Sequence, residues 1–346
     1  MDINLLTDDE ADRLRSLIAS STKVALVCHM NADGDALGSS LSWAEYLRQQ
    51  GKEATVIVPD MYPDYLQWIP GTQQSLRYDK KKEQAQQLLN EADLLCYLDL
   101  NTISRTGHEM PAALENYKGK VILIDHHEEP EIKADLMVSH PEMSSTSEMV
   151  FRLIWQLGGY DAITRDMATD IYCGMMTDTG AFTYNSTQPE IYFIISQLLA
   201  KGIDKDKIYR NVYHVYSVDR LRLWGHVLNR NLKVLYPPKH ASYFTISKEE
   251  MKKYNFKKGD AEGLVNVPLK ILKHKLSISL REDTEKERLV WISTRSVDDF
   301  PCDEMAKQFF NGGGHKNAAG GRLECSLSEA VEIVKKAIDA YADKLK

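Results

Sequence analysis

Short apolar runs alternate with helical patterns over the first half of the chain. The stretches between these runs place apolar residues three and four positions apart, as an amphipathic helix does. Such alternation predicts an α/β domain with a doubly wound, mostly parallel sheet. Four runs rich in β-branched or aromatic residues are typical of its buried strands: KVALVCH (23–29), ATVIVPD (54–60), DLLCYLDL (93–100) and VILIDHH (121–127).

Helical patterns then dominate up to about residue 230. An N-terminal amphipathic helix is expected as well, with Thr7 or Asp8 as its cap, and Ser145 or Ser147 is expected to cap the first helix after the strands. The last pattern is expected to be a connector. The predicted helices are STSEMVFRLIWQLG, RDMATDIYCGMMTDTG, PEIYFIISQLLAKG and SVDRLRLWGHVLNRNL.

The pattern changes beyond the connector. KVLYPPKHASYFTIS is typical of two strands around a turn at Pro237 and Pro238, because proline suits a turn better than a central strand. KHKLSISLRE and ERLVWISTRS alternate apolar and polar residues, which predicts antiparallel pairing with one solvated face. We therefore expect a first domain over 1–212, a connector helix over 213–230 and a smaller α+β domain over 231–346.

Composition narrows the class of protein. The chain has 346 residues, 43% of them hydrophobic and 27% charged, and it lacks an apolar run near the ~18 residues of a membrane span, so we expect a cytoplasmic location and no membrane partner. Five scattered cysteines without a CxxC pair disfavour a thiolate zinc site. A net charge of −7 argues against coating of long nucleic acid, which needs many basic contacts.

Acidic and histidine side chains cluster where the predicted strands end. The carboxyl ends of parallel strands lie along one edge of the sheet, so residues far apart in sequence can converge there. A lone DGD is most often a turn, and a lone Asp is often a helix cap. The metal site is inferred because several such residues occur together at successive strand ends. The candidates are His29, Asp33, Asp35, Asp99, Asp125, His126, His127 and Asp178.

Converging carboxylates repel one another, so such a cluster needs cations. Imidazole and carboxylate ligands without thiolate suit Mn²⁺ or Mg²⁺, with Zn²⁺ or Fe²⁺ as alternatives. The candidates are numerous enough for two ions that share a carboxylate, an arrangement used to hydrolyse phosphate esters. The sequence therefore predicts two divalent metal ions, Mn²⁺ first among them.

A glycine-rich stretch, NGGGHKNAAGG (311–321), is the second unusual feature. Its glycines would let the backbone approach an anion, and HKNAAG is expected to start a short helix whose N-terminus favours a phosphate. The alternative is a tight turn without a ligand. The stretch is not a Walker motif, because its lysine lacks the GK[ST] context.

Five ordered motifs resemble those of the DHH phosphoesterases and of their DHH-associated C-terminal domain. They cover nearly the whole chain, together with EGLVN (262–266) and ISTRS (292–296), which resemble the bacterial oligoribonuclease branch. Ala32 is a departure, because members often have proline there. The motifs are HMNADGDALGS, LDLN, IDHH, TDTGAF and GGGHKNAAGG.

The resemblance implies a role for each matched position and an active-site cleft between the two domains. Asp99 would bridge the two ions, Asp125 would orient His126, and His127 would contact the scissile phosphate. The implied ligand sets are His29, Asp33 and Asp99 for one ion and Asp35, Asp99, His126 and Asp178 for the other, with Arg295, Gly313, Gly314 and His315 binding substrate.

The resemblance further implies hydrolysis of short RNA or DNA oligonucleotides to mononucleotides, and activity on 3′-phosphoadenosine 5′-phosphate at the same site. A cyclic di-AMP or linear dinucleotide phosphodiesterase is the first alternative. An inorganic pyrophosphatase, an exopolyphosphatase and a non-catalytic nucleotide sensor are more distant ones. The sequence leaves a homodimer open.

Overall fold

The first half of the chain forms an α/β unit around one parallel sheet. The computed structural model describes residues 2–235 and 239–346, and the chain divides into two compact units, 1–215 and 216–346. The strand order β3-β2-β1-β4-β5-β6 is parallel throughout, which confirms the predicted doubly wound sheet. Its strands are β1 (Lys23–Val27), β2 (Glu53–Val58), β3 (Leu76–Arg77), β4 (Leu94–Leu98), β5 (Lys120–Asp125) and β6 (Leu136–Ser139).

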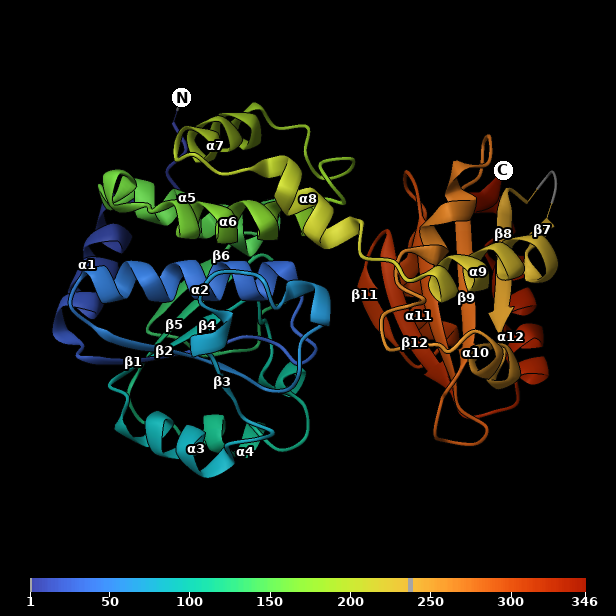
Figure 1. Cartoon of the computed structure of the whole chain (residues 1–346), viewed down its shortest axis with the longest axis horizontal. Helices are drawn as coiled ribbons and strands as arrows, with labels where there is room; N and C mark the ends of the chain where they lie inside the picture. Colours follow the sequence, from blue (N-terminus) through green and yellow to red (C-terminus); the bar gives the residue numbers. More distant parts are fainter. Residues whose placement is uncertain (1, 236–238) are drawn as a thin grey trace. The chain divides into compact units, whose positions relative to one another are not determined.

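Helices cover both faces of this sheet, because successive strand residues point to opposite sides. Leu26 and Cys96 face a core that includes α1, α2, α5 and α6, whereas Val27 and Tyr97 face α3 and α4 (Figure 1). The helices are α1 (Asp8–Ser20), α2 (Gly34–Gln49), α3 (Lys82–Glu91), α4 (Pro111–Glu115), α5 (Thr146–Gln156), α6 (Arg165–Asp178), α7 (Pro189–Ala200) and α8 (Lys205–Tyr213).

Helix caps account for several starting points. Thr7 caps α1 in a capping box with Glu10, and the Ser145 hydroxyl accepts a hydrogen bond from the amide of Glu148 at the start of α5. The sequence left two candidate cap residues open for each of these helices. The structure selects Thr7 over Asp8 and Ser145 over Ser147.

The second unit is built on a mixed sheet in the order β11-β12-β10-β9-β8-β7, in which only the β8–β9 pair is parallel. The predicted antiparallel pairing of the two alternating segments is confirmed as β9 with β10. Its elements are α9 (Val218–His226), a π-helical turn (Val227–Asn231), β7 (Lys233–Leu235), β8 (Ala241–Ile246), α10 (Lys248–Lys253), a 3-10 segment (Leu264–Lys270), β9 (Leu276–Glu282), β10 (Val290–Ser296), α11 (Cys302–Phe309), β11 (Gly313–His315), β12 (Ala318–Leu323) and α12 (Leu327–Ala340).

Three expectations need comment. The helix expected to start within HKNAAG is wrong: β11 and β12 form a hairpin there, and the loop glycines allow their backbones to lie close together. Pro237 and Pro238, where a turn was expected, lie outside the described residues. The predicted connector contains α9, and the second unit begins at Tyr216.

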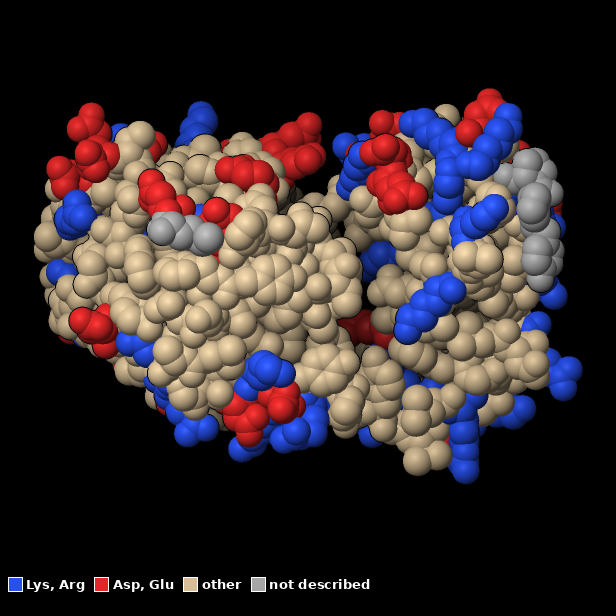
Figure 2. Space-filling view, turned by 90° about the horizontal axis from the view of Figure 1, so that it is seen from above, with Lys and Arg blue, Asp and Glu red and all other residues tan. Residues whose placement is uncertain are grey.

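Charge is divided unequally between the two units. Residues 1–215 carry 19 Lys and Arg against 32 Asp and Glu, whereas residues 216–346 carry 24 against 18, so the units have net charges of −13 and +6. Lys and Arg side chains outnumber acidic ones on the face of the second unit that Figure 2 shows at the right. Among the described residues, no helix is long and apolar enough to span a bilayer.

Candidate functional site

Three neighbouring strands end at one edge of the first sheet and bring the acidic and histidine candidates together. β1, β4 and β5 are parallel neighbours, so their carboxyl ends meet. The residues lie as follows: His29 beyond β1, Asp99 after β4, Asp125, His126 and His127 at the end of β5, Asp33 and Asp35 at the start of α2, and Asp178 at the end of α6.

One group of possible metal ligands consists of His29, Asp33 and Asp99. His29 Nε2 lies 3.3 Å from Asp99 Oδ2 and 3.8 Å from Asp33 Oδ1. Asp33 also caps α2, because its Oδ1 accepts hydrogen bonds from the amides of Asp35 and Ala36. The helix start therefore holds the Asp33 carboxylate beside the sheet edge.

A second group consists of Asp35, His126 and Asp178. His126 Nε2 lies 3.3 Å from Asp178 Oδ2 and 3.9 Å from Asp35 Oδ2. The same nitrogen lies 3.6 Å from Asp99 Oδ1, and Asp99 also forms a group with His126 and His127. Asp99 thus lies between the two groups, with one oxygen toward each.

The backbone at Asp99 is unusual. Its φ of 57° lies in the left-handed region, which costs a non-glycine residue free energy but is tolerated by Asp better than by most residues. Its amide still donates to the carbonyl of Ile124 on the neighbouring strand. This turn directs a fully buried carboxylate across the ends of β1 and β5.

The N-terminus of α5 holds Asp35, a feature that the sequence analysis missed. The amides of Thr146 and Ser147 donate to the two Asp35 carboxylate oxygens at 2.7 and 2.8 Å, and the Thr146 hydroxyl donates to Asp99 Oδ1 at 3.2 Å. Exposed amides at a helix N-terminus favour an anion. The Ser-Thr-Ser start of this helix was the available signal, but it was interpreted only as a cap.

Glycines let α6 approach α2 and α5 closely. A Cβ at Gly34 would lie 2.6 Å from Thr177 Cγ2, and a Cβ at Gly174 would overlap the side chain of Ser147. A side chain at Gly34 would therefore strike Thr177. Asp178 follows Thr177, so this contact brings its carboxylate toward Asp35.

The role expected for Asp125 also needs correction. Asp125 Oδ1 lies 2.8 Å from Nδ1 of His127, whereas Nδ1 of His126 lies 3.3 Å from the carbonyl oxygen of Met143. Adjacent residues beyond a strand end point in different directions, so the carboxylate reaches the second ring. Asp125 orients His127.

The electrostatics of the cluster reflect crowded charges in a buried space. Burial raises the pKa of Asp35 to about 7, and the charge of Asp99 adds to the rise. Burial and the charge of Asp35 likewise raise the pKa of Asp178 well above its usual value. Burial opposes the charged form of His126, but Asp178 and Asp99 outweigh it and raise its pKa to about 9.

The donor set fits divalent cations. Without them the cluster neutralises itself by holding protons, which is the response of buried carboxylates that lack a positive partner. The ligands are oxygens and imidazole nitrogens within 4.8 Å of one another in each group, and no cysteine belongs to any of them. Such a set suits Mn²⁺ or Mg²⁺.

The remaining candidates lie in the second unit, on β10 and β11. Arg295 and His315 both face Ala318 across their strand pairs, so they lie in one row of the sheet. Gly314 has a φ of 143°, a backbone conformation that residues with a side chain rarely adopt. Gly313 has neither a positive φ nor a close neighbour, since a Cβ there would meet only Lys307 Cε at 4.0 Å. Its lack of a side chain leaves space beside the sheet.

Comparisons with known proteins agree with this geometry. The model of the DHH family, N-terminal domain, matches residues 23–175, and the model of the DHHA1 domain matches residues 241–344. The crystal structure of an exopolyphosphatase-related protein from Bacteroides fragilis is 46% identical and superimposes with a TM-score of 0.93, covering 98% of this chain and 99% of that chain. The chain belongs to the DHH family of phosphoesterases.

Two curated relatives of this DHH-family chain differ in their named activities. The bifunctional oligoribonuclease and PAP phosphatase NrnA of Thermus thermophilus is 28% identical over 319 residues, 91% of this chain and 89% of that protein. The cyclic-di-AMP phosphodiesterase GdpP of Bacillus subtilis is 25% identical over 344 residues, 95% of this chain and 49% of that protein. The expected enzyme class, a hydrolase of phosphate esters, is confirmed by the family.

Substitution of Gly34 by alanine tests the helix approach. Gly34→Ala should lower the melting temperature of the DHH-family chain, because the new methyl group overlaps Thr177. Gly225→Ala in α9 is the matched control: nothing lies within 4 Å of its Cβ position, so it should be neutral or stabilising by up to about 1 kcal/mol. Equal effects of both substitutions would contradict a packing role for Gly34.

Metal binding should compete with protons. Because the pKa of His126 is about 9 and that of Asp35 about 7 without metal, both must lose protons to become ligands. Mn²⁺ affinity measured by calorimetry should therefore rise between pH 6 and pH 9. The observed binding enthalpy should vary linearly with the ionisation enthalpy of the buffer, and the slope gives the number of protons released. A pH-independent affinity would count against these ligands.

Proposed function

We propose that the protein hydrolyses short oligonucleotides to mononucleotides with two divalent metal ions, Mn²⁺ being the first choice. One observation carries the proposal: two groups of imidazole and carboxylate ligands, most of them buried, share Asp99. Paired metal sites of this kind serve hydrolysis of phosphate esters. The similarity to an NrnA oligoribonuclease over most of both chains supports the substrate class.

Each group of ligands would hold one ion. His29, Asp33 and Asp99 would hold the first, and Asp99 would extend its other oxygen to the second. Such a pair supplies Lewis-acid activation of water and neutralises the phosphate oxygens. The amides at the start of α5 keep Asp35 in position for the second ion. The second ligand set is Asp35, Asp99, His126 and Asp178.

His127 would act on the phosphate itself. Its bond to Asp125 orients the ring with a proton on Nδ1, as in other carboxylate–histidine pairs. A second proton, on Nε2, would let the ring donate a hydrogen bond to the leaving oxygen and stabilise the negative charge that develops there. Asp125 is a positioning residue in this scheme.

The second unit would bind the rest of the substrate. Arg295 offers a planar fork of donors that matches a phosphate, and His315 lies in the same row of the sheet. Because Gly313 and Gly314 have no side chains, the backbone is accessible in this part of the surface. A net charge of +6 over residues 216–346 favours an anionic substrate, and 3′-phosphoadenosine 5′-phosphate would be accepted at the same site.

Cyclic di-AMP is the second candidate substrate. The relative GdpP, a cyclic-di-AMP phosphodiesterase, matches 95% of this chain, although the match covers only about half of that protein. The same ligands and the same arginine would serve either phosphodiester. The two functions differ in whether a free end of the nucleotide chain is needed.

Asp99 is the residue whose change tests the shared site. Asp99→Asn should reduce kcat for any phosphodiester at least about 100-fold at saturating Mn²⁺, because both groups lose a charged ligand. The fold should persist, since asparagine has the same size and tolerates a left-handed φ. Asp161→Asn, at an exposed position outside the site, is the control and should keep wild-type activity. Unchanged turnover in Asp99→Asn would refute the paired-metal assignment.

A substrate panel tests the proposed specificity. Purified protein with Mn²⁺ should show its highest kcat/KM on RNA of two to five nucleotides, compared with long RNA, cyclic di-AMP, 3′-phosphoadenosine 5′-phosphate, pyrophosphate and polyphosphate. Short chains fit because the proposed binding residues are few and local. A preference for pyrophosphate or polyphosphate would overturn the proposal, and a preference for cyclic di-AMP would select the second candidate.

A further inference from the structure

One face of the second sheet is covered over only half of its width. α11 and α12 pack on the opposite face, against Ile278 and Ile292 among others. On this face α9 and the 3-10 segment 264–270 cover Phe244 and Ile246 of β8. Beyond them, side chains of β10, β12 and β11 on this face are exposed or half-buried, at the edge where Figure 1 labels β11 and β12.

The strand register arranges this open face in three rows, because directly paired residues point to the same side of a sheet. The middle row has almost no side-chain bulk, and the rows on either side of it contain arginines. The first row is Arg295, Ala318 and His315, the second is Ser293, Gly320 and Gly313, and the third is Arg281, Trp291 and Arg322.

Trp291 is the aromatic residue of the third row. This residue is 38% exposed, whereas the two aromatic residues of β8, Tyr243 and Phe244, are buried. The indole Nε1 donates a hydrogen bond to Asp283 Oδ2 at 2.7 Å, which fixes the orientation of the ring. Among the described residues, neither neighbouring arginine lies over this ring; Arg281 lies over Phe256 instead. A fixed, half-exposed indole is suited to stack against a flat ligand.

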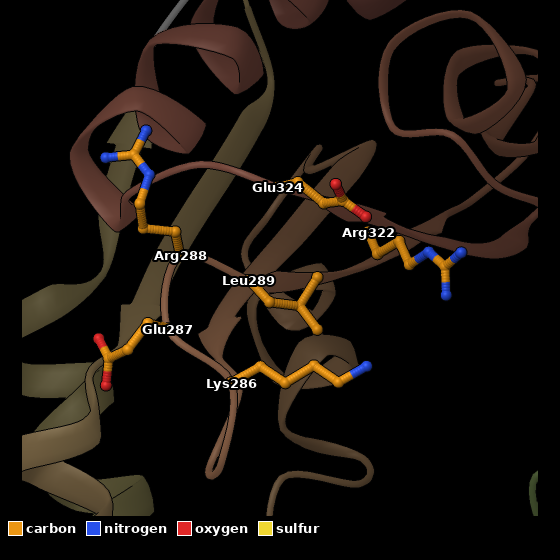
Figure 3. Close-up of a pocket in the computed structure, with 6 residues that line it drawn as sticks. All are labelled: Lys286, Glu287, Arg288, Leu289, Arg322 and Glu324. Atoms are coloured by element: carbon orange, nitrogen blue, oxygen red, sulfur yellow. The ribbon is translucent and has the colours of Figure 1, made fainter.

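Cations flank this ring, although the charge of Asp283, the carboxylate that binds the indole, acts on Arg281. Arg281 and Arg322 form no ion pair with any residue in 2–235 or 239–346. A depression of about 360 Å³ lies beside Arg322, and in Figure 3 the side chains of Lys286 and Arg322 extend from it in the same direction. Its other charges are partly paired, since Glu287 contacts Lys248 and Arg288 contacts Glu329; Glu324 also lines it.

The spacing separates this row from Arg295. Arg295 and Trp291 are four strand positions apart, which corresponds to about 13 Å, whereas a stacked nucleic-acid strand rises about 3.4 Å per nucleotide. We propose that Trp291, Arg281, Arg322 and Lys286 form a second nucleotide subsite, in which Trp291 stacks on a base and the cations bind the adjoining phosphates. This inference rests on the proposed function and names the substrate as a chain longer than a dinucleotide.

The test compares two substrate lengths in the full chain with Mn²⁺. Trp291→Ala should raise KM for a pentanucleotide RNA about 5- to 150-fold, as loss of one base stack does, with kcat unchanged. It should leave kcat/KM for a dinucleotide within about twofold, because a dinucleotide does not reach the third row. Trp291→Phe should restore most of the affinity, since a phenyl ring also stacks.

Charge variants give an independent readout. Arg322→Gln should weaken pentanucleotide binding and reduce the slope of log affinity against log salt by about one, whereas Lys335→Gln on α12 should leave both unchanged. Glu324→Gln should tighten binding, because it removes a carboxylate from the depression. If these residues had only a structural role, Arg322→Gln and Glu324→Gln would not change the binding affinity in opposite directions.

Two results would overturn the subsite: equal losses for dinucleotide and pentanucleotide in Trp291→Ala, or no loss for either. The proposed function fails separately if the wild-type protein does not cleave the pentanucleotide. In that case calorimetric binding of the pentanucleotide in EDTA decides the matter. Tighter binding to wild type than to Trp291→Ala would support the subsite, and equal binding would refute it.

Discussion

Repulsion among buried carboxylates is the constraint on which the first unit depends. Asp35 and Asp99 are buried and Asp178 lies half-buried beside them, so the three can be charged at the same time only if positive groups face them. The amides at the start of α5 supply part of that field at Asp35. The histidine rings supply more of it. Divalent cations would supply the positive charge that is still lacking.

Much of the surrounding structure serves to maintain this crowded arrangement. The parallel order β1-β4-β5 places three strand ends side by side, and a left-handed backbone at Asp99 turns its carboxylate between two groups of ligands. The absence of side chains at Gly34 and Gly174 lets α6 lie close to α2 and α5. The net charge of −13 suits the first unit to bind cations, and the net charge of +6 suits the second unit to bind an anion.

The parallel sheet and the convergence of the strand-end residues could be predicted because strand pattern and topology determine which ends meet. The ligand sets that share Asp99 were implied only by the resemblance to the DHH phosphoesterases. What the sequence could not show depends on side-chain direction and on close packing. Asp125 pairs with His127 because His126 and His127, adjacent beyond the strand end, point in different directions. Gly34 has no side chain because Thr177, more than 140 positions away, occupies that space. β11 and β12 replaced an expected helix because pairing with β10 outweighed a local helical pattern. Trp291 carried no motif, and only strand register placed it between two arginines.

The central claim is that one buried aspartate joins two cation sites. Anomalous diffraction at the manganese edge, from crystals grown with Mn²⁺, tests it most directly. We expect two peaks, one within bonding distance of His29 and Asp33 and one within bonding distance of Asp35, His126 and Asp178, with Asp99 contacting both. A single peak, or two peaks that do not share Asp99, would contradict the account.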